Sequence, residues 1–414
     1  MACSRWFAAH LRQALAKPYV HVLFGARQTG KSTLLRGLVP EPDLWLDLAD
    51  PAQRTRYLAR PDLLVEACSA LPARNRPLRV VVDEAQSVPA LFDAVQYLYD
   101  RDKKRFRFVL SGSSARKLRT TGANLLPGRA LVHRLFPLTL VERPASLPRA
   151  GAPAESALLR LPAQPMPDPF PATSLLDRLA FGELPGIALA PAEDRHDLLH
   201  AYSYIYLEEE LRREALIKDW PVFARFLRLA ALESGQMTNF AKIARQAGTS
   251  TPTVKSHYQL LEDMFVGFHV EAFSGSARKQ VLSTPRFLFF DLGVRNAAAE
   301  LTCSHDTVLA NPGPLFEQWV GIELWKRLQY LGRGRLHYLR TKGGAEIDFI
   351  VALDNLLLPI EVKWTDTPTL EDARHLRSFL DEQPRNVPHG WVVCRCDRPL
   401  RLEARITAIP WWWL

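Results

Sequence analysis

Short apolar runs alternate with amphipathic stretches over the first 140 or so residues of the chain. Runs at 20–24, 44–48, 79–83, 106–111 and 130–136 have the length and the branched or aromatic residues of buried strands. Stretches with leucines at helical spacing separate them. Strands that alternate with helices usually pair in the same direction, so this pattern predicts an α/β unit built on a parallel sheet.

A dense run of prolines interrupts this pattern. Eight prolines fall between residues 144 and 171, and alanine fills much of the space between them. Proline at this density breaks both helices and sheet ladders. The segment is therefore either a linker between domains or an extended arm that lies on a neighbouring surface.

The chain beyond the prolines is first helical and then mixed. Helical spacing covers 197–214, 221–233, 239–246 and 251–263. A further predicted helix at 315–330 precedes four apolar runs of strand type, at 336–339, 347–352, 357–363 and 390–394. The pattern predicts a first α/β domain, the proline-rich segment, a helical middle and a second α/β domain, over residues 1–143, 144–171, 172–280 and 281–414.

Composition and charge narrow the class of protein. Lys and Arg number 53 against 44 Asp and Glu, and the net charge of +9 favours a polyanionic partner such as DNA. The chain has no long apolar run for a secretory signal or a membrane span, and five scattered cysteines fit a reducing cytoplasm. The pair Cys394 and Cys396 consists of either buried thiols or two zinc ligands.

A glycine-rich turn follows the first predicted strand. The sequence from Gly25 to Ser32, GARQTGKS, fits the phosphate-loop pattern G-x-x-x-x-G-K-[ST]. Its backbone N–H groups would face phosphates, Lys31 would reach the β and γ phosphates, and Ser32 would ligate Mg²⁺. The residues expected to contact ATP are Gly25, Ala26, Arg27, Gln28, Thr29, Gly30, Lys31, Ser32 and Thr33.

Two acidic residues end the third predicted strand. Asp83 and Glu84 follow three valines, at the edge where parallel sheets place their ligand sites. We expect Asp83 to hold the Mg²⁺ shell and Glu84 to polarise the attacking water. This pair predicts hydrolysis of the nucleotide and not only its binding.

The phosphate loop and the acidic pair together resemble the AAA+ class of P-loop ATPases. More narrowly, most of the chain resembles an archaeal and bacterial ATPase family that joins an AAA-like module to a conserved carboxyl-terminal domain. The resemblance implies that Ser111 senses the γ phosphate, where many AAA+ proteins have a longer asparagine. It also makes Arg129 and Arg134 candidates for an arginine finger, the alternative being ordinary surface arginines.

The helical middle contains a second motif. Two short helices around a glycine turn at 247–249, followed by a strand-like run at 265–271, resemble a winged helix-turn-helix. The second helix carries side chains that suit phosphates or base edges, namely Thr253, Lys255, Ser256 and His257. Winged helices also serve as protein-binding modules and as ATPase lids, so both alternatives stay open.

Carboxylates gather near the carboxyl terminus. Asp348 lies on one predicted strand, and Glu361 and Lys363 share a face of the next, so a hairpin would bring the three together. With Glu317 on the preceding helix, the set resembles the PD-(D/E)xK nuclease superfamily. The resemblance implies that Asp348 and Glu361 bind Mg²⁺, that Lys363 is catalytic and that Glu317 supports them.

Two further residues complete this prediction. Arg340 and Lys342 lie in a basic loop suited to a phosphate backbone. The alternative to a nuclease is a salt-bridged hairpin on a nuclease-like fold without catalysis.

The sequence thus predicts an Mg²⁺-dependent ATP hydrolase that acts on duplex or branched DNA as a cytoplasmic homo-oligomer, in the form of a ring such as a hexamer. One alternative is an ATP-regulated nuclease. The other is a nucleotide-switched interaction protein whose nuclease-like domain is inactive.

Overall fold

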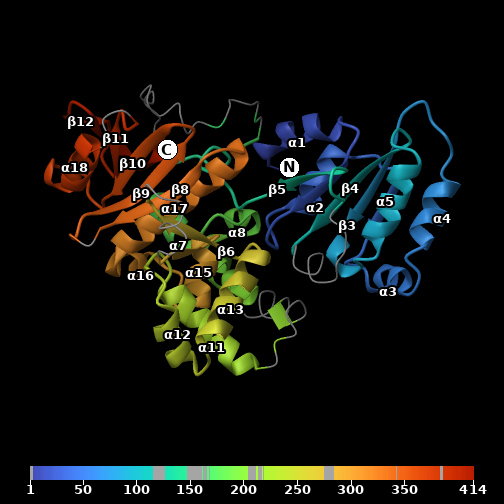
Figure 1. Ribbon diagram of the computed structural model, residues 1–414, viewed down its shortest axis with the longest axis horizontal. Helices are drawn as coiled ribbons and strands as arrows, with labels where there is room; N and C mark the ends of the chain where they lie inside the picture. The colour runs from blue at the N-terminus through green and yellow to red at the C-terminus, as the bar shows by residue number, and fades with distance from the viewer. Residues whose placement is uncertain are drawn as a thin grey trace. The chain divides into compact units, whose positions relative to one another are not determined.

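The five apolar runs of the amino-terminal region form a parallel sheet, as their alternation with helices predicts. The strands lie in the order β2-β3-β4-β1-β5, and every neighbouring pair is parallel (Figure 1). β1 lies inside the sheet, so the turn that follows it opens between two neighbouring strands. The strands are β1 (Val20–Phe24), β2 (Leu44–Asp47), β3 (Leu78–Asp83), β4 (Phe106–Gly112) and β5 (Ala130–Arg134).

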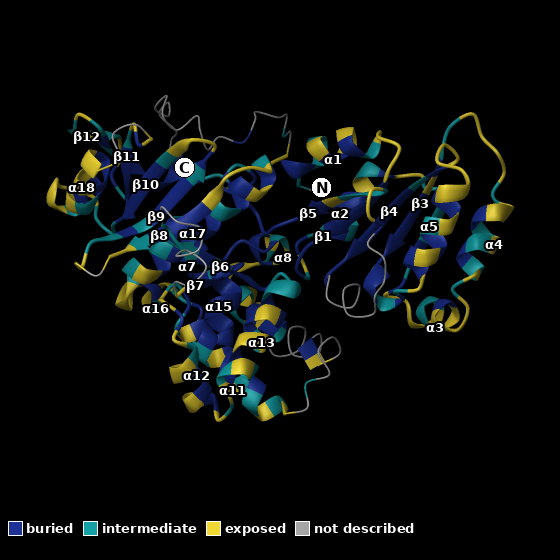
Figure 2. Cartoon of the chain, viewed as in Figure 1, coloured by how far each residue is buried: buried dark blue, intermediate teal, exposed yellow. Residues whose placement is uncertain are grey.

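Helices connect and cover these strands. Buried apolar side chains from β1, β3 and β4 pack with those of α5 into one core, while the helices keep exposed residues on their outer faces (Figure 2). The helices are α1 (Phe7–Leu15), α2 (Lys31–Leu38), α3 (Pro51–Ala59), α4 (Leu63–Ala70) and α5 (Leu91–Arg101).

The computed structural model describes residues 3–114, 126–146, 161, 166, 168–203, 211–212, 217, 219–274, 284–341, 343–382 and 386–414. They form two compact units. The first contains the residues up to Phe136 together with Met166 and Leu260–Val266. The second contains the remaining described residues from Pro137 to Leu414.

The second unit begins with helices, as predicted for the chain beyond the prolines. Several of them cap their first turn with a side-chain oxygen: Ser174, Asp219, Asn239, Asp291 and Ser304 each accept from the backbone N–H three residues further on. The helices are α7 (Leu175–Phe181), α8 (Pro185–Leu189), α9 (Arg195–Ala201), α11 (Trp220–Leu232), α12 (Phe240–Ala247), α13 (Thr251–Asp263), α15 (Leu292–Ala298), α16 (His305–Ala310), α17 (Pro312–Leu331) and α18 (Arg374–Glu382).

A mixed eight-stranded sheet forms the other part of the second unit. Its order is β12-β13-β11-β10-β9-β8-β6-β7. β8, β9 and β10 are antiparallel neighbours, and β11 lies parallel to β10 after the α18 crossover. The strands are β6 (Gly267–Ala272), β7 (Arg286–Phe289), β8 (Arg335–Arg340), β9 (Glu346–Leu353), β10 (Leu356–Val362), β11 (Gly390–Cys394), β12 (Leu400–Glu403) and β13 (Ile406–Pro410).

The helix pair of the middle region is joined to this sheet. β6 follows α13, pairs antiparallel with β7, and also pairs parallel with β8 through Glu271 and Ala272. The domain boundary predicted at residue 280 falls between the two strands of this hairpin. The strand-like run at 265–271, which the sequence predicts as the β-element of a winged helix, is therefore also part of the carboxyl-terminal sheet.

The proline-rich segment, the cysteine pair and the expected lack of a membrane span can also be compared with the structure. Within the proline-rich segment, residues 147–160, 162–165 and 167 lie outside the described residues, and so does Lys342. Cys394 and Cys396 are buried with their Sγ atoms 3.3 Å apart. In the described part of the chain, no group of three or more His, Cys, Asp or Glu residues is arranged to hold a metal. No described helix has the length and apolar character needed to cross a membrane.

A pair of histidines lies in the core of the first unit. His21 on β1 and His133 on β5 are buried, and their ring nitrogens lie 3.1 Å apart. Burial, and then the neighbouring His21, lower the pKa of His133 to about 4. Burial also lowers the pKa of His21. Both rings are therefore neutral in the folded protein near pH 7.

This pair predicts a loss of stability in mild acid. Between pH 6.5 and about 4 the unfolded chain binds a proton that folded His133 does not, so stability falls as the pH falls. We expect a loss of about 2 kcal/mol near pH 5. The measurement compares melting temperatures near pH 7 and pH 5 for the wild type and His133→Gln. An equal acid-induced drop in both proteins would contradict the assignment.

Candidate functional site

The turn between β1 and α2 has the backbone of a phosphate loop. Gln28 and Gly30 adopt left-handed φ angles of 60° and 90°. Gly25 has no room for a side chain, because a Cβ there would lie 2.3 Å from the Leu135 carbonyl oxygen. This close approach explains the first glycine of the motif and fixes the loop against the end of β5.

Internal hydrogen bonds stabilise the loop. The buried Lys31 ammonium donates to the carbonyl oxygens of Gly25 and Ala26, at 2.9 and 3.0 Å. Arg5 donates to the carbonyl oxygens of Thr29 and Phe136, at 2.6 and 2.7 Å. Arg5 therefore ties the loop to the end of the sheet, a role that the sequence did not indicate because Arg5 lies in no motif.

The predicted Mg²⁺ ligand and the predicted sensor lie together. Asp83 ends β3 and is 3% exposed, and the Ser111 hydroxyl of β4 donates to its carboxylate. Ser32 and Thr33 lie in the first turn of α2. Because β1, β3 and β4 are parallel neighbours, their carboxyl ends place the loop, Asp83 and Ser111 at one edge of the sheet.

Glu84 is held in a defined position beside Asp83. It has a left-handed φ of 54°, which turns its side chain away from the strand direction. Its Oε2 accepts from the Gln86 amide at 2.5 Å and lies 3.4 Å from the Ser113 hydroxyl, and the same amide donates to Ser113. No role was predicted for Gln86 or Ser113 from the sequence, although they lie two positions after Glu84 and Ser111.

The two candidate finger arginines lie at opposite ends of β5. Arg134 is exposed and pairs in register with Phe24, directly before the phosphate loop. Arg129 precedes β5 at the other edge of the sheet, where it forms an ion pair with Asp100 at 2.7 Å. Within one chain, only Arg134 of these two lies at the edge that carries the loop.

The helix pair α12–α13 carries the residues that the sequence predicts to contact DNA. Lys255 and Ser256 are exposed, and Thr253 bonds to Ser250 in the first turn of α13. The ring of the half-buried His257 packs against Phe223 and Phe226 of α11, with centroids 4.8 and 5.0 Å away. His257 therefore also contributes to the interface between α11 and α13.

The carboxylates near the carboxyl terminus converge as the hairpin prediction requires. β9 and β10 pair antiparallel, and Asp348 accepts from the Val362 amide at 2.8 Å. Lys363 forms an ion pair with Glu361 at 2.8 Å. Burial and the neighbouring Asp348 raise the pKa of Glu361 to about 7. Glu361 Oε2 is buried and has no hydrogen-bond partner among the described residues.

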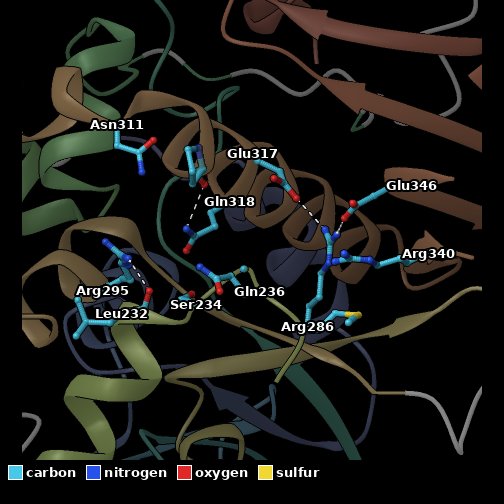
Figure 3. Close-up of a pocket in the computed structure, with 13 residues that line it drawn as sticks. Leu232, Ser234, Gln236, Arg286, Arg295, Asn311, Glu317, Gln318, Arg340 and Glu346 are labelled. Carbon is cyan, nitrogen blue, oxygen red and sulfur yellow. Dashed lines mark hydrogen bonds and ion pairs between the residues drawn. The ribbon is translucent and has the colours of Figure 1, made fainter. Parts of the chain in front are cut away.

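Arg286 on β7 is a member of this cluster that the sequence did not reveal. It donates to Glu317 on α17 at 2.8 Å and to Glu346 on β9 at 2.5 Å, reaching between them (Figure 3). Burial and the Asp348 charge still raise the pKa of Glu317 to about 8. Burial is the largest cause of both raised pKa values, and repulsion from the neighbouring Asp348 adds to it.

A cavity of about 510 Å³ opens beside this cluster. Glu317, Glu346 and Arg286 line one part of it, and Arg340, predicted to contact phosphates, lines it from the end of β8 (Figure 3). The turn after α11 and the start of α17 line the rest. Within the second unit, the cavity therefore extends from the turn between α11 and α12 to the carboxylates.

The amino-terminal region, which carries the phosphate loop, is similar to a known protein family. Residues 17–143 match a family described as an AAA domain. The amino-terminal region is an AAA-like P-loop domain. Residues 172–304 and 312–414 match two families described as domains of unknown function, DUF8612 and DUF4143.

Similar whole chains carry no assigned activity. An uncharacterized protein of Mycobacterium tuberculosis is 28% identical over 376 residues, which cover 90% of this chain and 76% of the relative. An uncharacterized protein of Haemophilus influenzae is 22% identical and covers 88% of this chain and 87% of its own. Both alignments extend well beyond the AAA-like domain, so the relatives share its combination with the second unit.

Two solved structures give weak matches. C. elegans PCH-2 is 14% identical, covers 62% of this chain and 65% of its own, and has a TM-score of 0.22. Protein VC1899 of Vibrio cholerae is 11% identical, covers 92% and 90%, and has a TM-score of 0.17. Scores this low do not indicate a shared overall arrangement.

The match to an AAA domain is consistent with the phosphate loop, Asp83 and Ser111 lying together at the carboxyl edge of the sheet. Such domains bind nucleotides, and the loop from Gly25 to Thr33 is the part of this domain that can surround phosphates. Asp83 and Ser32 carry side-chain oxygens of the kind that bind Mg²⁺ in proteins.

Proposed function

We propose that this chain is an Mg²⁺-dependent ATP hydrolase that acts on DNA. The observation that carries the hydrolytic part is the position of Glu84, which lies directly after the predicted Mg²⁺ ligand Asp83 and is held by Gln86 and Ser113. A carboxylate that only closed a strand end would not need two such partners. A fixed carboxylate beside the phosphate loop suits the orientation of an attacking water.

The proposed chemistry uses groups of this domain. Lys31, which in this structure donates to the backbone of its own loop, would exchange those bonds for phosphate oxygens. Mg²⁺ held by Ser32 and Asp83 would neutralise phosphate charge. Glu84 accepts the proton of the attacking water, and Ser111 bonds to Asp83 and so links β4 to the Mg²⁺ ligand. An arginine from a neighbouring copy, such as Arg134, would add positive charge in a ring-shaped oligomer.

The part of the proposal that concerns DNA rests on charge and on the helix pair. The chain carries a net charge of +9, and α13 presents Lys255 and Ser256 to solvent. In the second unit, Arg340 lines a cavity beside carboxylates that have raised pKa values. Each of these features suits a phosphate backbone.

The test is ATP turnover with and without single-stranded, duplex and branched DNA, repeated over a series of salt concentrations. We expect at least one DNA form to stimulate turnover several-fold and the stimulation to weaken as salt rises. Lys31→Ala should remove turnover under every condition. Turnover that is equal with every DNA form and without DNA would refute the proposed action on DNA, while absent turnover would refute the hydrolase.

A second candidate function, an ATP-regulated nuclease, is favoured by one observation. Glu361 Oε2 is buried without a hydrogen-bond partner among the described residues, next to Asp348 and Lys363. Asp348 and Glu361 fit Mg²⁺ as a pair of oxygen ligands, with water completing the shell. A bound Mg²⁺ would polarise a phosphodiester, and Lys363 would orient the attacking water.

Strand scission tests this second candidate. Supercoiled and linear DNA incubated with Mg²⁺ or Mn²⁺ should be cut by the wild type and left intact by Asp348→Asn. Absence of scission with both metals would remove the nuclease and favour a nucleotide-switched interaction protein with an inactive nuclease-like domain.

A further inference from the structure

Basic side chains gather at the edge of the AAA-like sheet opposite the phosphate loop. They lie at the amino ends of neighbouring strands, where the chain enters β3, β4 and β5. We call this surface the basic edge and define it as Arg79, Lys103, Lys104, Arg105, Arg107 and Arg129. Asp100 and Asp102 lie among them, and the Asp43 carboxylate accepts from the Arg79 backbone N–H at 2.7 Å, so the positive charges still exceed the negative ones.

Two of these arginines are neighbours in the sheet. Arg79 of β3 is the register partner of Arg107 of β4, and neighbouring strands lie only about 4.8 Å apart. Among the described residues, neither guanidinium pairs with a carboxylate, and Arg107 bonds instead to the carbonyl oxygens of Lys103 and Phe106. Like charges placed side by side destabilise a sheet unless an anion lies between them.

The other cations extend this pair into a row. Arg105 donates to the carbonyl oxygens of Ser69 and Leu71, and Lys103 lies 6.0 Å from the centroid of the Tyr99 ring. Tyr99 donates to the Pro18 carbonyl at 2.9 Å and interacts electrostatically with both Arg107 and Arg129. The row therefore continues from β3 across β4 and the start of β1 to β5.

The dimensions of the row suit a nucleic-acid backbone. Three steps between strands span about 14 Å. Phosphates along one strand of B-DNA repeat every 3.4 Å or so, so the row faces about four of them. Guanidinium groups, which predominate here, fork onto phosphate oxygens. Tyr19, 38% exposed at the start of β1, adds a ring on which a base can stack.

We propose that the basic edge is a binding surface for the phosphate backbone of DNA, on the opposite side of the sheet from the ATP site. This inference rests on the proposed action on DNA and adds a surface outside the helix pair and the carboxylate cluster. β3 carries Arg79 near one end and Asp83 at the other, and β4 carries Arg107 and Ser111 in the same way. Each of these two strands joins the two surfaces directly.

The test measures DNA affinity of the full chain by fluorescence anisotropy over a salt series. The edge variant carries Arg79→Gln, Lys103→Gln and Lys104→Gln, three exposed residues. Its control carries Arg54→Gln, Arg56→Gln and Arg60→Gln, which remove the same charge from α3 and the residue after it. We expect the edge variant to bind DNA about tenfold more weakly or worse, with a salt slope shallower by roughly two to three, and the control to change little.

Each outcome has a separate meaning. If the wild type binds no DNA, the proposed action on DNA fails and the inference fails with it. If the wild type binds DNA and the edge and control variants bind equally well, only the basic edge is refuted. Loss of binding to vesicles containing phosphatidylserine, with DNA affinity retained, would also refute it and assign the surface to a membrane. ATP turnover without DNA should be the same in all three proteins, which reports on folding.

Discussion

Replacing Glu84 with glutamine is expected to lower ATP turnover by about a hundredfold or more while ATP still binds. Glutamine keeps the shape and can still bond to Gln86 and Ser113, but it cannot accept the proton of the attacking water. The loop, Lys31 and Asp83 are unaltered, so the nucleotide keeps its contacts. Turnover assays together with a nucleotide-binding titration measure the two effects separately.

The control is Glu66→Gln on the exposed face of α4, which removes the same charge far from any strand end. It should leave turnover unchanged. A Glu84→Gln protein that retains more than about a tenth of the wild-type rate would show that another group takes the proton. A variant that fails to bind ATP would instead assign Glu84 to the binding site.

Glu323→Gln is expected to cause the largest loss of stability. Glu323 lies on α17, is 1% exposed, and forms ion pairs with Lys326 at 3.0 Å and Arg327 at 2.9 Å. It also accepts from the Leu140 amide at 3.0 Å. Without its charge, two buried cations lose their counterion, which costs about 3–5 kcal/mol. Thermal unfolding of the full chain should show the transition of the second unit at a clearly lower temperature.

Glu371→Gln is the matched control, because Glu371 pairs with Arg374 on an exposed surface, three residues apart. Its effect should be small. The Lys326 and Arg327 charges also lower the pKa of Glu323 to about 2. Its contribution is therefore present above pH 4.5 or so and disappears as the pH falls toward 2. A Glu323→Gln protein that melts with the wild type would show that the cations find other partners.

The local pattern was enough to predict the parallel sheet and its ligand edge. Runs of apolar residues mark the strands. The phosphate-loop motif restricts the backbone, because its glycines either adopt left-handed φ angles or lie close to other backbone atoms. The hairpin of Asp348 and Glu361 was predictable for a similar reason, since alternation along a strand decides which side chains share a face.

Residues that act through tertiary contacts escaped prediction. Arg5 and Arg286 belong to no motif, and their roles depend on which distant carbonyl or carboxylate the fold brings near them. The packing of His257 could not be predicted either, because it depends on Phe223 and Phe226 of another helix. Helical spacing predicts which side chains share a face of a helix, but it does not predict which other element packs against that face.

The strand β6 lies between β7 and β8 and belongs at once to the helix pair and to the carboxyl-terminal sheet. A fragment that begins at residue 312 would leave β8 with a bare edge of unpaired N–H and C=O groups, including those of His337 and Tyr338 that now face β6. Such a fragment should aggregate when produced alone. The helix pair and the carboxylate cluster therefore depend on each other for folding, because removing the first exposes the edge of the sheet that carries the second.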